Sequence, residues 1–489
     1  MKRFWLVTAL VMWCTAALQG QSFESPCTAG GVRFETGYES SSLGAVQLLD
    51  SVWVRQTLKD SVLHLSYRID SRMDPANPAD PELEPSARWF AFRMVGVKDK
   101  HIYLNFTQTD PQRAVYSYDG ATYTRFESYR AALARADEVF TQDTVYIAYS
   151  YPYTYGYLQQ RLQDWLQCPD VRMDTIGYSL QGLPLQRLVI TDPRVAESQK
   201  TRVWIHARTH PGETPGSWQL DGLIDALTAA TPQGQALRSA SAFYIVPFSN
   251  PDGVYGGYSR SNARGINQEV NWDQPDSLTG VEVQALRTAL QELWSKGPVD
   301  LALNVHSQSQ DGISYYIHKA AATSDAYFER EMQFMYFTCA RNPYMRPEDA
   351  FYSSPAPKYV EGWFWGNYPG QAIALTLETP YSFYKGTEPQ EWVTPASLRH
   401  SGERVLLGIA DFFRWNLPDR YLVNGVRKGA KTICRVPALP AGTYSLARWT
   451  GSDWQPEGEV NQKKTARYQH KVKADGTKEA VALWRLDRK

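Results

Sequence analysis

The chain has 489 residues, of which 43% are hydrophobic, so it is long enough for a large core and for two or three domains, and a disordered chain is excluded. Its 51 lysines and arginines balance its 51 aspartates and glutamates. Because a nucleic-acid-binding protein carries a basic excess, we expect no nucleic-acid partner.

The N-terminus has the layout of a secretory signal peptide. Lys2 and Arg3 precede an apolar stretch at residues 4–18, and small and polar residues follow it. The apolar stretch is too short for a membrane span. We predict a signal peptide over residues 1–20 that is cleaved before Gln21, which makes the mature protein secreted or periplasmic and leaves it without a transmembrane segment. An uncleaved membrane anchor is the alternative.

Residues 23–155 are predicted to form an N-terminal antiparallel β-sandwich domain. Runs of alternating or β-branched residues, such as SVLHLSYRI and RWFAFRMVGV, are typical of strands. Clusters of Asp, Pro and Gly separate these runs and indicate turns and loops.

Residues 156–416 have a different pattern, in which strands alternate with helices. The stretch YGYLQQRLQDWL has apolar residues at helical spacing. The runs TRVWIHA, SAFYIVPF, VDLALNVH and QAIALTLE are nearly continuous in apolar residues, as are strands that are buried on both faces. The pattern predicts an α/β domain with a mixed, mostly parallel sheet flanked by helices.

Residues 417–489 are rich in turns and strand-like runs, and we predict a small β-rich C-terminal domain. This segment has 15 lysines and arginines against 7 aspartates and glutamates, a net charge of +8. Such a basic surface suits contact with an anionic cell wall or membrane, and an ordinary solvated surface is the alternative.

A candidate metal site lies at the ends of two predicted strands. His210 and Glu213 flank a Pro-Gly turn between a strand and a helix, and His306 ends the buried strand of DLALNVHSQSQ. Open α/β sheets bind ligands at the carboxyl ends of their strands. A catalytic zinc ion takes three protein ligands from imidazole and carboxylate groups. We therefore predict one Zn²⁺ ion held by these three residues, and we interpret His206, which alternates with Trp204 inside its strand, as structural.

Glu378 ends a third apolar strand, in QAIALTLETP. Charged residues rarely end a buried strand. A carboxylate beside an activated water can take its proton and pass it to a leaving amine. Glu378 is therefore the predicted general base, and a surface glutamate at the sheet edge is the alternative.

Together these motifs resemble the zinc metallocarboxypeptidase family. HPGET, the Trp-containing helix after it, VPFSNPDGV and the strands that end in His306 and Glu378 follow the order of that family. The HPGET spelling is most similar to the cytosolic-carboxypeptidase branch, which carries a β-sandwich domain before the catalytic domain. The resemblance covers roughly residues 85–415 and implies a carboxypeptidase-like fold.

The resemblance also implies residue roles. His210, Glu213 and His306 would be the zinc ligands and Glu378 the general base. Arg260, in YSRSNARGINQEVNWD, matches the family arginine that polarises the scissile carbonyl. The substrate-binding tyrosine of the family would be Tyr359, with Tyr352 and Tyr368 as alternatives.

One motif departs from the family. Where the family has an Asn-Arg pair that binds a terminal carboxylate, this chain has Glu269-Val270. Valine cannot supply the bidentate contact of an arginine, and a glutamate repels a carboxylate. Either another basic residue, such as Arg264 or Lys358, takes over this contact, or the substrate presents no free carboxylate there. Glu269 could instead meet a cationic amine.

The predicted function is that of an exported zinc peptidase that hydrolyses amide bonds in peptides by metal-activated water. A zinc amidase or carboxypeptidase that acts on cell-wall peptides is one alternative. A non-catalytic binding protein on a carboxypeptidase-like scaffold is another, and a carbohydrate-binding adhesin that uses the aromatic β domain is a third.

Overall fold

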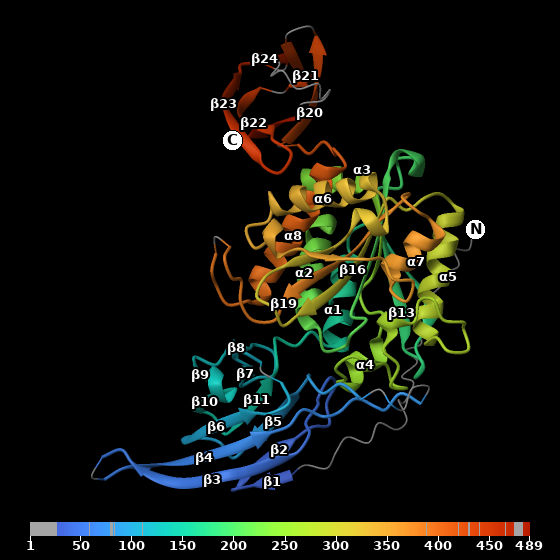
Figure 1. Ribbon diagram of the computed structural model, residues 1–489. Helices are drawn as coiled ribbons and strands as arrows, with labels where there is room; N and C mark the ends of the chain where they lie inside the picture. Colours follow the sequence, from blue (N-terminus) through green and yellow to red (C-terminus); the bar gives the residue numbers. More distant parts are fainter. Residues whose placement is uncertain are drawn as a thin grey trace, which may run out of the picture.

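The computed structural model describes residues 27–489 except 58, 79–81, 83, 110, 388, 419, 429–430, 440, 465 and 474–482, so the predicted signal peptide lies outside the described residues. A strand-rich N-terminal part, a central α/β part and a strand-rich C-terminal part follow one another along the chain (Figure 1). None of the helices in the described part of the chain is long and apolar enough to cross a membrane.

The N-terminal part consists of two sheets. The first contains, in spatial order, β1 (Cys27–Ala29), β2 (Val32–Glu35), β5 (Ala91–Val95), β11 (Thr144–Ala148), β7 (Val115–Ser117) and β8 (Thr124–Arg125). The second contains β3 (Val46–Arg55), β4 (Ser61–Ile69), β6 (Lys100–Phe106), β10 (Arg135–Val139) and β9 (Ser128–Arg130). Buried side chains of both sheets, such as Phe92 and Leu104, form one shared core.

The pairing in this part is antiparallel with one exception. Strands β4 and β6 pair in parallel, from Leu63 opposite Lys100 to Ile69 opposite Phe106. The strand between them in sequence, β5, lies in the other sheet. Because the chain crosses to that sheet and returns, β6 runs in the same direction as β4, and the expectation of a wholly antiparallel domain is wrong at this pair.

The central part is built on a mixed eight-stranded sheet. Its spatial order is β12 (Val171–Tyr178), β13 (Pro184–Ile190), β15 (Ser241–Val246), β14 (Thr201–Ala207), β16 (Leu301–Gln308), β19 (Ile373–Pro380), β17 (Ser314–His318) and β18 (Phe351–Ser353). The four middle strands, β15, β14, β16 and β19, are parallel to one another. Strands β12 and β13 pair antiparallel, as do β13 with β15 and β17 with β19.

Helices cover both faces of this sheet. They are α1 (Tyr155–Trp165), α2 (Thr214–Thr228), α3 (Pro232–Ala240), α4 (Pro251–Gly256), α5 (Val281–Ser295), α6 (Asp325–Cys339), α7 (Val360–Asn367) and α8 (Pro395–Phe412). Short 3₁₀ helices are η1 (Ala131–Leu133), η2 (Glu197–Gln199), η3 (Gln268–Val270), η4 (Ala320–Ala322) and η5 (Pro347–Asp349).

Alternation along β14 explains the two helical layers. Val203 and Ile205 share a core with apolar residues of α2 and α8, whereas Trp204 faces the opposite core with residues of α5 and α7. Successive side chains of a strand point to opposite faces of the sheet. A strand that is apolar at every position therefore has apolar side chains on both faces, and helices cover both faces. The predicted fold class, a mixed and mostly parallel sheet flanked by helices with strand-rich parts on either side, is confirmed.

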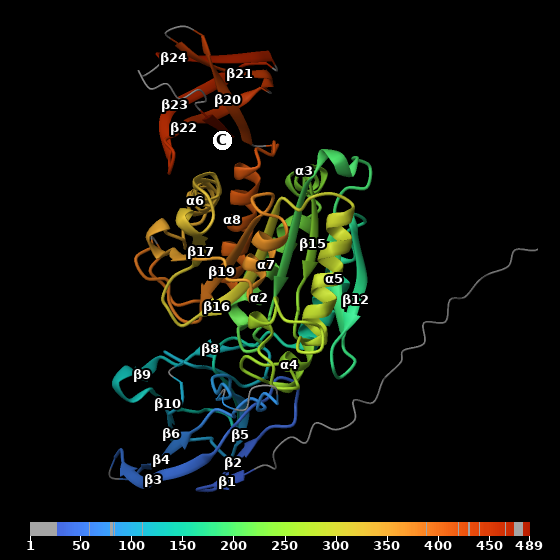
Figure 2. The same cartoon turned by 45° about the vertical axis from the view of Figure 1, so that its right-hand side comes forward.

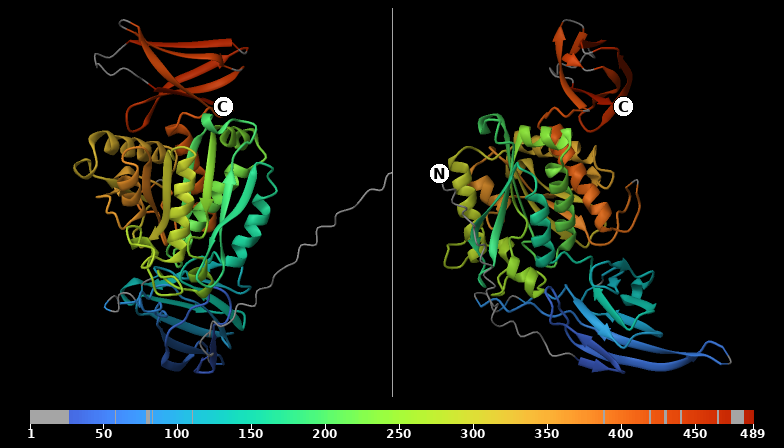
Figure 3. Two further views of the ribbon diagram at one scale, coloured as in Figure 1. Left: turned by 90° about the vertical axis from the view of Figure 1, so that its right-hand side faces the viewer. Right: turned by 180° about the vertical axis from the view of Figure 1, so that it is seen from behind.

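The C-terminal part is a six-stranded antiparallel sheet. Its order is β23 (Trp454–Gln462), β22 (Gly442–Trp449), β25 (Leu483–Arg488), β20 (Arg420–Lys428), β21 (Lys431–Leu439) and β24 (Ala466–Lys473). Helix α8 leads directly to it (Figure 2). The N-terminal sandwich and the C-terminal sheet lie at opposite ends of the central part (Figure 3).

Candidate active site

Three buried side chains converge at the carboxyl ends of β14 and β16. His210 and Glu213 lie in the turn between β14 and α2, and His306 lies near the end of β16. Each is at most 4% exposed. Gly212 makes this turn possible, because its backbone nitrogen donates to the carbonyl oxygen of Ser259 at 3.0 Å and a Cβ there would lie only 3.1 Å from that oxygen.

The donor atoms of these residues fit a zinc ion. The Nδ1 atom of His210 lies 2.8 Å from Glu213 Oε1 and 3.1 Å from His306 Nδ1, and His306 Nδ1 lies 2.9 Å from Glu213 Oε2. Ligands at ~2.0–2.1 Å around a tetrahedral zinc ion are about 3.3 Å apart, and two imidazoles with one carboxylate form a known catalytic donor set. Burial raises the pKa of Glu213, but the charges of His210 and His306 outweigh it and hold this pKa well below its usual range.

Neighbouring groups orient two of the donors. The backbone nitrogen of Ser307 donates to Glu213 Oε2 at 3.0 Å. The second ring nitrogen of His210, Nε2, lies 3.1 Å from Asn267 Oδ1 and 3.0 Å from Glu269 Oε2. Such outer contacts fix the ring orientation and tautomer of a metal-binding histidine.

Glu378 lies beside this centre. It is the register partner of His306 on the adjacent strand β19, and its carboxyl group lines the same cavity. Its Oε2 atom is buried and has no hydrogen-bond partner among the described residues. Burial and the negative charge of Glu213 raise the pKa of Glu378 to about 7. A carboxyl group with a pKa near neutrality can both accept and donate a proton.

Arg260 reaches the centre from the loop that follows α4. Its Nη1 atom donates to Glu213 Oε1 at 3.4 Å and its Nη2 atom donates to Glu269 Oε2 at 3.2 Å. Its side chain is 34% exposed and lines the cavity, so a ligand can reach the guanidinium group.

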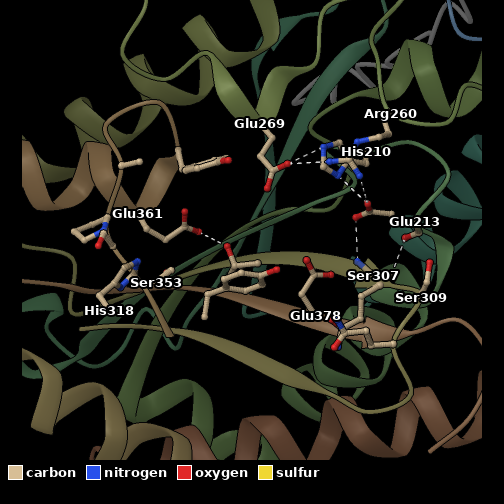
Figure 4. A pocket seen from close by; sticks show the side chains of 18 of the residues that line it. His210, Glu213, Arg260, Glu269, Ser307, Ser309, His318, Ser353, Glu361 and Glu378 are labelled. Atoms are coloured by element: carbon tan, nitrogen blue, oxygen red, sulfur yellow. Dashed lines mark hydrogen bonds and ion pairs between the residues drawn. The ribbon is translucent and has the colours of Figure 1, made fainter. Parts of the chain in front are cut away.

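These groups share one cavity of about 550 Å³ (Figure 4). Its lining includes Arg88, His210, Glu213, Arg260, Glu269, Ser307, Tyr316, His318, Tyr359, Glu361, Thr376 and Glu378. Of the three tyrosines considered as the substrate-binding tyrosine, Tyr359 is the one that lines the cavity. Of its two alternatives, Tyr352 is exposed and donates to the sulfur of Met332, and Tyr368 stacks on Trp294 with ring centroids 3.6 Å apart.

Of the three residues predicted to bind substrate, only Glu269 lines the cavity. Burial raises its pKa, but the charges of His210 and His306 lower it to about 2. Val270, in η3, and Arg264, which is exposed, lie outside the cavity lining.

Several lining residues were not predicted from the sequence. Arg88 comes from the N-terminal part, and Tyr316, His318 and Glu361 come from β17 and α7. Nothing in the local pattern around Arg88 indicates a role in a site formed by another domain. The one feature of the sequence that points to Glu361 as a lining residue is its position two residues after Tyr359 in PKYVEGW.

Residues 158–354 match the model of the zinc carboxypeptidase family. This part of the chain belongs to that family. The zinc carboxypeptidase match includes His210, Glu213, Arg260 and His306 and ends before Glu378. The predicted family resemblance is confirmed, and residues 158–354 form a carboxypeptidase-like metallopeptidase domain.

Curated relatives are similar to the chain over a longer range. Cytosolic carboxypeptidase 6 from Homo sapiens is 26% identical over 427 residues, which are 79% of this chain and 80% of that protein. The protein of the same name from Mus musculus is 24% identical over 421 residues, 79% of this chain and 74% of that protein. A metallo-carboxypeptidase structure from Burkholderia cenocepacia, 21% identical, covers 78% of this chain and 99% of its own with a TM-score of 0.65, so the two share a fold.

Proposed function

We propose that this metallopeptidase hydrolyses amide bonds of peptides with Glu378 as the general base and Arg260 as the group that polarises the carbonyl. The observation that carries the proposal is that His210, Glu213, Glu378 and Arg260 line one cavity and that His306 completes the three-donor set beside it. His210, Glu213 and His306 would hold the zinc ion. When bound, zinc supplies a Lewis acid that lowers the pKa of water toward neutrality and polarises a carbonyl oxygen.

The chain's own residues account for the proton and charge transfers. As the oxygen of a water molecule attacks the amide carbon, Glu378 takes a proton from that water and then passes it to the leaving nitrogen when the C–N bond breaks. The guanidinium of Arg260 donates to the carbonyl oxygen while negative charge builds up there. Tyr359 contributes a hydroxyl group to the cavity for binding the substrate.

A mixed peptide library incubated with the protein, with and without a zinc chelator, tests this function. Mass spectrometry should detect cleavage products that disappear when the chelator is present and return when zinc is added back. Cleavage that continues unchanged in the chelator would contradict the metal mechanism.

A second candidate is an amidase or carboxypeptidase that acts on cell-wall peptides. Two observations favour it: Glu269 stands in the cavity where the family has a carboxylate-binding pair, and residues 417–489 carry a net charge of +8. The positions of the cuts separate an amidase from a carboxypeptidase, because a carboxypeptidase removes only the last residue of a peptide.

We also propose that the protein is exported and that the signal peptide is removed. The charged start, the apolar stretch at residues 4–18 and the small residues after it support this location. N-terminal sequencing of the mature protein should begin at Gln21, and a mature chain that still begins with Met1 would contradict cleavage.

A further inference from the structure

One end of the cavity carries a buried carboxylate that forms no ion pair among the residues that the structure describes. Glu361 lies in the first turn of α7, lines the cavity and is 6% exposed. Its Oε1 atom accepts hydrogen bonds from Thr376 on β19 and from Asn304 Nδ2 on β16, the latter at 3.4 Å. Within the described part of the chain, no lysine, arginine or histidine forms an ion pair with it. Figure 4 shows Glu361 and His318 on the side of the cavity away from His210 and Glu213.

The neighbouring charges do not neutralise this carboxylate. His318 lies at the same end, but its Nδ1 atom is 2.8 Å from Glu331 Oε1 and its backbone nitrogen donates to Glu331 Oε2 at 2.7 Å. The His318–Glu331 pair has no net charge when the imidazole is protonated and is negative when it is neutral. Arg260 contacts Glu213 and Glu269 instead.

The remaining cavity arginine, Arg88, packs over the ring of Tyr381, with its guanidinium carbon 5.9 Å from the ring centroid.

The local structure around Glu361 suits the binding of a cation. The first turn of a helix favours a negative charge, and two donors from the sheet hold one oxygen of this carboxylate in place. A buried carboxylate without a counter-ion is costly, so a ligand that supplies the counter-ion gains a strong, charge-assisted interaction. Both of these hydrogen bonds reach Oε1, so Oε2 is the atom available to such a ligand.

The position of Glu361 assigns it to the leaving-group side of the substrate. The backbone nitrogen of Trp272 donates to the carbonyl oxygen of Lys358 at 3.1 Å, which joins the start of α7 to the Glu269 segment. The family that the motifs resemble has its carboxylate-binding pair at the position of Glu269-Val270, and the terminal carboxylate of a peptide belongs to the residue that leaves. Glu269 adds a second negative charge there and disfavours an acidic ligand.

We propose that this end of the cavity, formed by Glu361 with Thr376, Tyr316 and Ser353, binds the ammonium or guanidinium group of the residue on the leaving-group side of the scissile bond. This assignment rests on the proposed peptidase function and adds its substrate class. Lysine and arginine of ordinary peptides and the amine-bearing diamino acid of cell-wall peptides all present this chemistry.

The test uses the zinc-loaded protein and blocked peptides that differ only in the residue after the scissile bond: lysine, arginine, norleucine, glutamate or diaminopimelate. We expect kcat/KM for lysine to exceed that for norleucine by about ten-fold or more, and glutamate to be the poorest substrate. A preference for diaminopimelate over lysine would support a cell-wall source, and the reverse order an ordinary peptide. Equal or better hydrolysis of norleucine or glutamate would overturn the proposal.

A matched pair of variants attributes the preference to Glu361. Glu361→Gln keeps the side-chain size and one acceptor for Thr376, and it should reduce the lysine-to-norleucine ratio to about one. Glu292→Gln, which removes the same charge from an exposed position on α5, should leave that ratio as in the parent. A lysine preference that survives in Glu361→Gln would overturn the assignment.

A binding measurement separates this proposal from the proposed activity. Calorimetry on Glu378→Gln with the lysine and norleucine peptides reports the subsite without requiring turnover. Tighter binding of the lysine peptide, lost in the Glu361→Gln/Glu378→Gln double variant, supports the cation site even if no peptide is hydrolysed. Equal binding of both peptides contradicts the cation site even if hydrolysis is found.

Discussion

Glu213 is buried and Glu378 is half-buried; their carboxyl groups line one cavity, and their surroundings shift the two pKa values in opposite directions. Burial raises the pKa of both groups. At Glu213 the charges of His210 and His306 reverse this effect, whereas at Glu378 burial and the charge of Glu213 act together and raise the pKa to about 7. Two carboxyl groups with pKa values pushed apart are suited to different tasks, which agrees with the proposal that Glu213 holds a metal ion and Glu378 moves a proton.

Two buried histidines on neighbouring strands provide a matched test of the metal ligands. His306→Gln should lower bound zinc well below one ion per chain, because it removes one of three protein donors. His206→Gln should keep about one ion per chain, since His206 Nδ1 accepts a hydrogen bond from Trp204 Nε1 at 3.0 Å instead of facing the donor set. Metal analysis of the purified variants measures both, and equal zinc loss in the two would contradict the ligand assignment.

At the scale of elements, a loop that carries Arg260 is held by a residue of another domain. Asp74, in the N-terminal part and 5% exposed, accepts hydrogen bonds from the backbone nitrogens of Ser259 at 2.7 Å, Arg260 at 2.7 Å and Ser261 at 2.9 Å. The Ser259 hydroxyl in turn accepts from the backbone nitrogens of Arg88 at 2.9 Å and Trp89 at 3.0 Å. The position of Arg260, the residue proposed to polarise the carbonyl, therefore depends on the N-terminal sandwich.

We expect Asp74→Ala to lower kcat/KM by about ten-fold to a hundred-fold without loss of zinc, because a small displacement of Arg260 misaligns it with the carbonyl oxygen. Since Asp74 acts through Arg260, the double variant Asp74→Ala/Arg260→Ala should be no slower than Arg260→Ala alone. Losses that simply add in the double variant would show that Asp74 acts by another route.

The sequence was sufficient to predict elements whose pattern is local. Continuous apolar runs identified the central strands, and polar residues at their carboxyl ends identified His210, Glu213, His306 and Glu378 as a group. Arg88 and Asp74 could not be predicted, because their positions depend on how one domain packs against another. The parallel pairing of β4 with β6 was missed for the same reason, since it depends on which sheet β5 joins.

At the scale of the whole molecule, the N-terminal and C-terminal parts differ in their relation to the site. Arg88 from the sandwich lines the cavity, and Arg125 donates from the sandwich to the carbonyl oxygens of Tyr381 and Val393 at 2.6 and 3.0 Å. The C-terminal sheet contributes no residue to the cavity lining in the described part of the chain. This sheet contacts the central part through Trp449, whose ring stacks on the ring of Phe337 with the two ring centroids 4.2 Å apart.

Truncation should separate these roles. Removal of residues 417–489 should lower Tm, because Phe337 loses an apolar cover, while kcat/KM stays within about two-fold of the parent. Removal of residues 1–155 should abolish activity, since it removes Arg88 and Asp74 together with the sandwich core. Peptide hydrolysis and thermal unfolding of both truncated proteins measure these effects, and an active chain that begins at residue 156 would contradict the role given to the sandwich.

The most direct test of the central claim is the kcat for peptide hydrolysis by Glu378→Gln, measured beside its zinc content. Glutamine has the size of glutamate but cannot accept the proton from water. We predict that kcat falls by about a hundred-fold to ten-thousand-fold while about one zinc ion per chain remains bound. A fully zinc-loaded variant that retains a kcat close to that of the parent would contradict the proposed role of Glu378.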